Sequence, residues 1–275
     1  MPLFVIATPI GHLGDVTQRL GSTLASLDLL FAEDTRRVRQ LAHHLGVTLP
    51  ATLSLDDHQE SSRVALLLER LAEGGRVGIV SDAGTPCIAD PGFRLVRSAR
   101  EAGYEVVALP GPCALTAFLS IAGLPTDRFT FGGFVPRRQG ERQRFLERAL
   151  RLDDTFVCYE APHRLLDTLD AISAVDADRL LVVGRELTKR HEEVCAGVAS
   201  LIAARFRAQG EVRGELVLGW AGAPAPEAVP DAELAAWIEA LRGAGLGAKA
   251  IARVLGGRLG LRTREVYAAV LRTEG

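Results

Sequence analysis

Short apolar runs and helical repeats of apolar positions alternate along most of the chain. This alternation is typical of α/β proteins, in which helices cover a sheet. The runs that we interpret as strands are Leu3–Thr8, Val77–Val80, Glu105–Leu109, Phe129–Phe134, Thr155–Tyr159, Leu180–Val183 and Glu215–Trp220. The helical patterns are Thr35–Gly46, Ser61–Glu73, Phe93–Ala102, Ala114–Ala122, Arg138–Leu150, Pro162–Ala174 and Ala199–Ala208. We therefore expect two α/β domains, at residues 1–123 and 124–222.

The segment after the first strand is ambiguous. Asp15 and Gln18 resemble a capping box, which predicts a helix from there to about Leu30. Leu27–Ala32 is compatible with the end of that helix or with a strand.

The pattern changes beyond the last expected strand. Ala221–Asp231 is rich in proline and alanine, which favours a semi-rigid linker. Helical patterns follow at Ala232–Leu241, Ala248–Leu255 and Arg262–Leu271, with turns expected at Gly243–Gly247 and Gly256–Gly260. We expect a helical module at 230–275, either a helix-turn-helix-like binder or a packing and dimerisation appendage.

Charge is unevenly distributed on a chain whose net charge is only −2. Residues 136–151 hold six arginines against two glutamates, and residues 242–272 hold six arginines and Lys249 against Glu265. Two basic segments on a nearly neutral protein indicate local contact with an anion. The chain has two lysines and no asparagine, so part of its arginine content reflects a compositional bias.

Several function classes are disfavoured by missing motifs. The chain has no GxxxxGK[ST], no GxGxxG after a strand and no GxSxG, which argues against P-loop ATPases, nicotinamide dehydrogenases and α/β-hydrolases. His191–Cys195 begins like a zinc-binding HExxH but lacks the second histidine, so we expect no metal. Four scattered cysteines, no signal peptide and no long apolar run predict a cytoplasmic protein without membrane spans.

Three loops rich in glycine and proline follow expected strands: Thr8–Asp15, Ser81–Gly92 and Leu109–Ala114. Open α/β sheets bind ligands at loops that follow the carboxyl ends of their strands. Each loop alone is compatible with an ordinary turn. Together they predict a ligand-binding cleft.

These loops carry a family resemblance. The stretch S-D-A-G-T-P-C-I-A-D-P-G at 81–92, with T-P-I-G at 8–11, A-E-D-T-R at 32–36 and P-G-P at 110–112, resembles the tetrapyrrole-methylase superfamily. Three further stretches, G-F-V-P-R at 133–137, Y-E-A-P-H-R at 159–164 and R-E-L-T-K at 185–189, resemble its ribosomal RNA small-subunit cytidine 2′-O-methyltransferases. The resemblance runs from about residue 3 to 221.

The resemblance implies two α/β domains with S-adenosylmethionine in the cleft between them, and a homodimer. It also implies that the substrate is a cytidine in the decoding centre of 16S ribosomal RNA, either as naked RNA or in the assembled 30S subunit. The chain departs from the family pattern at His12, where asparagine is expected, and at Ala89, Cys113 and Ala161, where serine is commoner.

The resemblance suggests roles for the loop residues. We expect the cofactor to contact Pro9, Gly11, Asp82, Ala83, Gly84, Cys113 and Ala114. A carboxylate such as Asp82 suits the cationic sulfonium, although an aspartate here is also compatible with a turn or a helix cap.

The catalytic candidates include more than one possible base. Asp34 and Arg36 are expected to face the cleft, with Arg36 on a substrate phosphate, although acidic residues also favour a helix N-terminus. The deprotonating base is left open among Glu33, Glu160, His163 and Lys189, and a lysine requires a depressed pKa. Arg137, Arg138, Arg142 and Arg164 are the expected RNA contacts, and a solvated arginine-rich helix is the alternative for the first three.

Two other functions compete. A tetrapyrrole C-methyltransferase shares the cofactor loops but gives no reason for the basic tail or for the stretch at 159–164. A non-catalytic RNA-binding protein leaves the three loops without a purpose.

Overall fold

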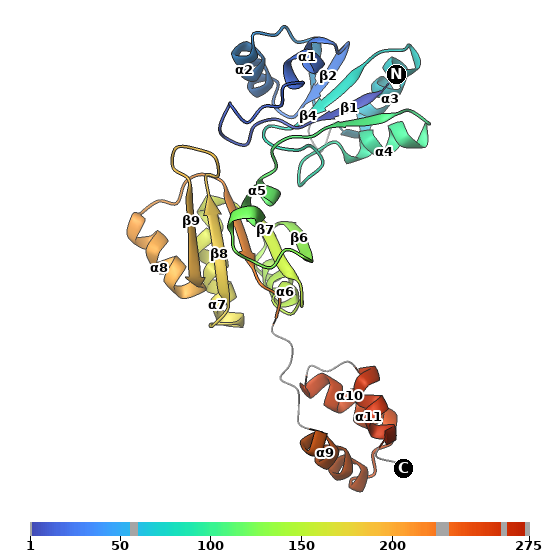
Figure 1. Cartoon of the computed structure of the whole chain (residues 1–275), viewed down its shortest axis with the longest axis vertical. Helices are drawn as coiled ribbons and strands as arrows, with labels where there is room; N and C mark the ends of the chain where they lie inside the picture. Colours follow the sequence, from blue (N-terminus) through green and yellow to red (C-terminus); the bar gives the residue numbers. More distant parts are fainter. Residues whose placement is uncertain (1, 56–59, 224–230, 260–262, 273–275) are drawn as a thin grey trace. The chain divides into compact units, whose positions relative to one another are not determined.

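The computed structural model describes residues 2–55, 60–223, 231–259 and 263–272 (Figure 1). The chain divides into two compact units, Met1–Gly222 and Ala223–Gly275. Most of the expected linker at Ala221–Asp231 lies outside the described residues. Within the described residues, no helix combines the length and the apolar character that a bilayer span requires.

The first sheet of the larger unit is entirely parallel. Its strands are β1 (Leu3–Ile6), β2 (Leu29–Ala32), β3 (Ala51–Ser54), β4 (Val77–Val80) and β5 (Val106–Leu109). They lie in the order β3-β2-β4-β1-β5. The central strands β2 and β4 are buried along their whole length, because helices cover both faces of the sheet.

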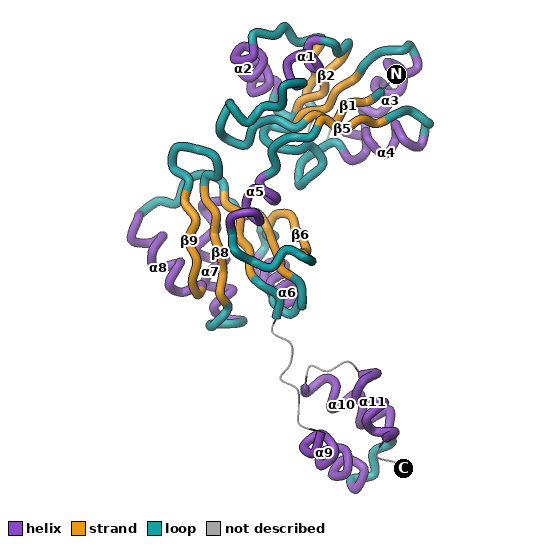
Figure 2. Tube along the Cα trace, in the orientation of Figure 1, coloured by secondary structure: helices purple, strands orange, loops and turns teal. Residues whose placement is uncertain are grey.

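Alternate side chains of β2 feed two separate cores. Leu29 and Phe31 pack toward α3 (Glu60–Ala72) and α4 (Phe93–Glu101), whereas Leu30 and Ala32 pack toward α1 (Leu20–Ala25) and α2 (Thr35–Leu45). A fully apolar strand is therefore required between the two helical layers, which Figure 2 shows on either side of the sheet.

The second sheet is mixed. Its strands are β6 (Phe129–Phe134), β7 (Thr155–Glu160), β8 (Leu180–Arg185), β9 (Glu193–Val198) and β10 (Leu216–Trp220). They lie in the order β6-β7-β10-β8-β9, and only β6 and β7 are parallel. Three helices pack on one face: α6 (Gln139–Ala149), α7 (Leu165–Val175), which follows the 3-10 turn η1 (Pro162–Arg164), and α8 (Ala199–Gln209).

Helix α5 (Ala114–Ile121) covers the other face of the second sheet, although it follows directly from β5 of the first. Leu115 and the fully buried Phe118 pack against Val157, Val182 and Val217. Ile10, from the loop after β1, and Leu187, from the loop after β8, belong to the same cluster. One apolar core therefore joins loops and strands of both sheets.

The smaller unit consists of α9 (Asp231–Gly243), α10 (Ala248–Leu259) and α11 (Thr263–Arg272). Ile238, Ile251, Leu255 and Val270 form its core. The expected turn at Gly243–Gly247 is confirmed, and Gly245 has a positive φ of 81°. The expected turn at Gly256–Gly260 is wrong as far as Leu259, because α10 continues through Gly256, whose burial beside Leu255 outweighs the low helix propensity of glycine. Gly260 lies outside the described residues.

The prediction of a helix opened by Asp15 and Gln18 is also wrong. The Asp15 amide donates to the His12 carbonyl in a turn, and α1 begins only at Leu20. The following segment is needed as a central strand, so tertiary packing resolves Leu27–Ala32 in favour of β2. The predicted α/β class, with two sheets and a helical C-terminal part, is confirmed.

Candidate active site

Three loops at the carboxyl edge of the first sheet are joined by hydrogen bonds. Thr8 and Gly84 pair through their backbones, with the Thr8 amide 2.8 Å from the Gly84 carbonyl and the reverse bond at 3.0 Å. The Thr85 hydroxyl donates to the Pro112 carbonyl at 3.0 Å. Gly84 has a φ of 79°, which glycine adopts without strain. The loops after β1, β4 and β5 thus form one surface.

This surface forms one wall of a cavity of about 340 Å³. Five of the expected cofactor residues line the cavity: Asp82, Ala83, Gly84, Cys113 and Ala114. The other two, Pro9 and Gly11, line an adjoining cavity of about 370 Å³. The two cavities share Ile10, Arg37, Asp82, Ala83 and Glu215. The second sheet supplies the facing wall, through residues that include Tyr159, Leu187 and Val217.

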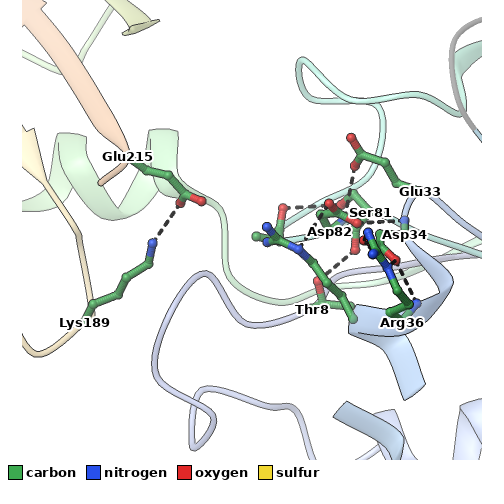
Figure 3. Close-up of polar contacts among 10 residues, drawn as sticks. Thr8, Glu33, Asp34, Arg36, Ser81, Asp82, Lys189 and Glu215 are labelled. Carbon is green, nitrogen blue, oxygen red and sulfur yellow. Dashed lines mark hydrogen bonds and ion pairs between the residues drawn. The ribbon is translucent and has the colours of Figure 1, made fainter. Parts of the chain in front are cut away.

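Asp82 connects the loops after β2 and β4. Its Oδ1 accepts from the Asp34 amide at 2.8 Å, and its own amide donates to Glu33 Oε2 at 3.1 Å (Figure 3). Its Oδ2 lies 3.4 Å from Arg37 Nε. Asp82 therefore has a structural partner on each side while still lining both cavities.

Asp34 and Arg36 have mainly local partners. Asp34 is the N-cap of α2 and accepts from the Arg36 amide at 2.8 Å, and the Arg36 guanidinium binds the same carboxylate at 2.6 Å. Hydrogen bonds from Arg36 lower the pKa of Asp34 to about 2, which makes it a weak proton acceptor. The Arg36 side chain is 82% exposed, and neither residue is among the described residues lining the two cavities.

Five acidic residues line the first cavity: Glu33, Asp82, Asp90, Glu160 and Glu215. Burial raises the pKa of Asp90 to about 7, the charge of Glu33 adds to this shift, and a hydrogen bond from Ser81 partly opposes it. Asp90 is therefore poised to exchange a proton near neutral pH. Sequence reasoning named neither Asp90 nor Glu215, although Asp90 lies within the most specific stretch of the chain.

Lys189 does not meet the condition for a lysine base. Its Nζ lies 2.8 Å from Glu186 Oε1 and 3.2 Å from Glu215 Oε2, the second contact being drawn in Figure 3. Burial alone lowers the pKa of Lys189, but the hydrogen bonds and charges of the two carboxylates outweigh it, so its pKa is raised. Lys189 is a fixed cation at the second cavity.

Glu160 and Arg164 form a buried ion pair, with Arg164 Nη2 2.6 Å from Glu160 Oε1. The same carboxylate accepts from the Ala161 amide at 2.7 Å and from the Thr168 hydroxyl at 2.5 Å. Arg164 also donates to the Val135 carbonyl at 2.9 Å. Both charges therefore have internal partners. His163, between them in sequence, is exposed and is not among the described residues lining the cavities.

The arginines at the start of α6 differ in accessibility. Arg137 is exposed, and the Arg138 side chain is 84% exposed, 3.4 Å from Glu141. The Arg142 side chain is largely buried and lies 3.8 Å from Asp167. The first two arginines are placed to reach an external anion, and Arg142 is held closer to the protein.

Gly11 is a point where the two halves of the site pack closely. A Cβ at this position would lie 2.4 Å from Lys189 Cγ and 3.0 Å from the Leu187 carbonyl oxygen. We expect Gly11→Ala to destabilise the larger unit by about 1–3 kcal/mol, since overpacking forces both loops to shift. Thermal denaturation checks this, and Gly21→Ala on α1, where the nearest atom lies at 3.4 Å, is the matched control. Equal melting temperatures for both variants would contradict the close packing.

The chain matches the family model described as Tetrapyrrole (Corrin/Porphyrin) Methylases over residues 2–203. Several similar proteins bear the name ribosomal RNA small subunit methyltransferase I. The one from Mycobacterium tuberculosis is 42% identical and covers 98% of this chain and 95% of its own. The one from Haemophilus influenzae is 41% identical, and the match covers 85% of this chain and 86% of its own.

Solved structures of lower identity share the fold. The methyltransferase CobJ has a TM-score of 0.60 at 22% identity, over 82% of this chain and 96% of its own. A diphthine synthase has a TM-score of 0.60 at 16% identity, and the match covers 80% of this chain and 89% of its own. At these identities the likeness shows the arrangement of the elements alone.

Proposed function

Since the chain belongs to the tetrapyrrole methylase family and, within it, to the ribosomal RNA small subunit methyltransferase I proteins, we propose that it methylates the ribose 2′-hydroxyl of a cytidine in 16S ribosomal RNA, with S-adenosylmethionine as the methyl donor. The observation that carries the proposal is the cavity that five acidic residues line at the carboxyl edge of the first sheet. The names of the similar proteins support the RNA substrate.

The residues of the cavity fit a cofactor with a cationic and an apolar part. Asp82, Glu33 and Glu215 offer negative charge to a sulfonium or an ammonium group. Ile10, Leu187 and Val217 offer apolar surface, and Ala83 and Gly84 let a ligand approach the backbone. When bound, the cofactor supplies an electrophilic methyl group.

The chain must then hold the acceptor hydroxyl and take its proton. Asp90 lines the same cavity, and its pKa of about 7 matches the range in which a general base is most effective. Glu33 accepts a hydrogen bond from the Asp82 amide, which orients it beside Asp90. We assign proton removal to Asp90 and the positioning of the Asp82 loop to Glu33.

The basic segments are assigned to the RNA. Arg137 and Arg138 project from the start of α6, and the smaller unit contributes exposed Arg253, Arg258, Arg264 and Arg272. Phosphate contacts of this kind orient a protein on RNA without reading its sequence. The proposal includes a homodimer acting in the cytoplasm, in line with the family resemblance.

The test is methyl transfer to a defined product. Purified protein is incubated with labelled S-adenosylmethionine and small ribosomal subunits that lack the modification, and the labelled nucleoside is identified after digestion. Recovery of 2′-O-methylcytidine is the expected result. Transfer to a tetrapyrrole precursor instead would overturn the RNA assignment, and the absence of cofactor binding would favour a non-catalytic RNA-binding protein.

Arg138 gives a prediction for RNA binding. Each phosphate contact contributes about 0.7–0.9 to the slope of log affinity against log salt. We expect Arg138→Ala to reduce that slope by roughly 1 without changing the preferred sequence. Filter binding over a salt series measures it, with Arg97→Ala, which removes another exposed arginine paired with a glutamate on α4, as the control. An unchanged slope for Arg138→Ala would exclude this contact.

A further inference from the structure

Phe134 is directed to the surface by an irregularity in β6. The pairing with β7 shifts register between Phe131 and Phe134. A Cβ on Gly132 would lie 2.4 Å from the Phe156 ring, and Gly133 has a φ of 68°. Gly132 therefore has no room for a side chain, and Gly133 has a backbone conformation that favours glycine. Bulges of this kind redirect a side chain beside a functional site. The result is a phenylalanine that lines the first cavity and is yet 53% exposed.

The surroundings of Phe134 hold it in place. Its ring meets the Tyr159 ring edge to face, with centroids 5.4 Å apart at 65°. The Tyr159 hydroxyl accepts from the Leu115 amide at 3.1 Å, at the start of α5. The Val135 amide donates to the Tyr159 carbonyl at 3.0 Å, and Arg164 binds the Val135 carbonyl. An exposed aromatic ring is thus fixed by its contact with the partly buried Tyr159 and by the buried Val135 that follows it in the chain.

The position at the rim separates Phe134 from the apolar interior. Ile10, Leu187 and Val217 are buried and line the same cavity, so apolar surface for the cofactor is already present inside it. Phe134 stands outside that group, and the exposed Arg137 lies three residues further along the chain. An aromatic face beside guanidinium groups is the combination that binds an unstacked nucleotide, by its base and its phosphate.

We infer that Phe134 is the platform on which the base of the target nucleotide stacks, so that its ribose reaches the cavity. This inference rests on the proposed function and adds to it a substrate-positioning residue. A nucleotide inside an RNA structure must be turned out before its sugar can enter a cavity, and stacking on a fixed ring offsets part of that cost. Stacking accepts any base, so Phe134 contributes position and not sequence preference.

The test compares Phe134→Ala, Phe134→Leu and Phe134→Trp in steady-state methyl transfer to small subunits that lack the modification. Alanine and leucine are expected to lower kcat/KM for the subunits about five- to 100-fold, since both remove the aromatic face. Tryptophan is expected to stay within about threefold of the original, because it stacks at least as well. Phe93→Ala, which removes another exposed phenylalanine (62%) on α4, is the control and should change nothing.

Two parallel readouts separate the possible failures. Cofactor affinity and melting temperature should be the same for all the Phe134 variants, and a parallel loss of cofactor affinity would overturn the assignment to the RNA base. Full activity of Phe134→Leu would also overturn it. If the original protein transfers no methyl group to RNA, the proposed function fails. In that case, the platform is still supported if Phe134→Ala weakens binding to the small subunits and Phe134→Trp restores it. Equal binding by all the Phe134 variants would exclude the platform.

Discussion

Replacing Asp90 with asparagine is expected to lower the rate of methyl transfer by at least about a hundredfold, the usual contribution of a general base. Asparagine keeps the size of the side chain but cannot take up a proton from the ribose hydroxyl. Cofactor affinity should change little, because Glu33, Asp82 and Glu215 remain in the cavity. Single-turnover transfer and calorimetric cofactor binding measure the two quantities separately.

The dependence on pH adds a second signature. A base with a pKa of about 7 is protonated below that value, so the rate should rise with pH and level off above about pH 8. Asp90→Asn should lose this rise together with the rate. Glu33→Gln is the matched control, and it should lower the rate less and keep the rise. If Glu33→Gln abolishes transfer and Asp90→Asn does not, the base is Glu33.

The ionisation of Asp90 should also make the free energy of unfolding depend on pH, in a direction that follows from its raised pKa. An unfolded aspartate has a pKa near 3.8, whereas burial first, and then the charge of Glu33, raise that of Asp90 to about 7 in the folded chain. Between these values the folded state holds a proton that the unfolded state releases, so the free energy of unfolding falls as pH rises from about 4 to 7. Asp90→Asn removes this contribution, and melting curves across that range reveal the difference.

Glu160→Gln is expected to reduce the free energy of unfolding of the larger unit by about 3–5 kcal/mol, the effect of removing one partner from a buried ion pair. The Glu160 carboxylate is fully buried and accepts from Arg164, the Ala161 amide and the Thr168 hydroxyl. An amide can offer only one of its two ends as an acceptor, so one donor and the Arg164 charge lose their partner. Denaturant unfolding measures the difference.

A matched variant isolates the effect of burial. Asp167→Asn removes a carboxylate that also faces an arginine, Arg142, but Asp167 is exposed and the pair lies at 3.8 Å. Exposed pairs contribute up to about 1 kcal/mol, so this change should have little effect. Similar losses for the two variants would show that the carboxylate of Glu160 is not what stabilises the turn before α7.

The sequence pattern did not reveal β3 and β9, which are two of the four edge strands of the described sheets. β3 and β9 each pair on one side only, and their side chains are partly exposed, so neither shows a continuous apolar run. Val77–Val80 lies at the centre of its sheet, and the pattern predicted its limits correctly. Hydrophobic pattern reports burial, and the edge strands that it did reveal, β5 and β6, carry either a continuous apolar run or several phenylalanines.

The residues of the site also divide into those that the sequence predicts and those that only the fold brings together. Asp82 to Gly84 are predicted as site residues from the family resemblance, because the stretch at 81–92 that carries it contains all three. Tyr159 in β7 and Glu215, which directly precedes β10, belong to the other sheet and reach the cavity only through the tertiary fold. Phe134 was counted as a strand residue, since a register shift cannot be read from the alternation of side chains. Arg164 differs in the opposite way. The family stretch makes it an expected RNA contact, but in the fold its guanidinium is paired with Glu160 inside the protein.

Helix α5 belongs to the first sheet by connection and to the second by packing. Residues 125–128, which follow it, are all exposed. A protease that cut there would sever the chain but leave α5 seated against Val157, Val182 and Val217. The two fragments would therefore stay associated as a noncovalent complex, and the nick would become visible only under denaturing electrophoresis.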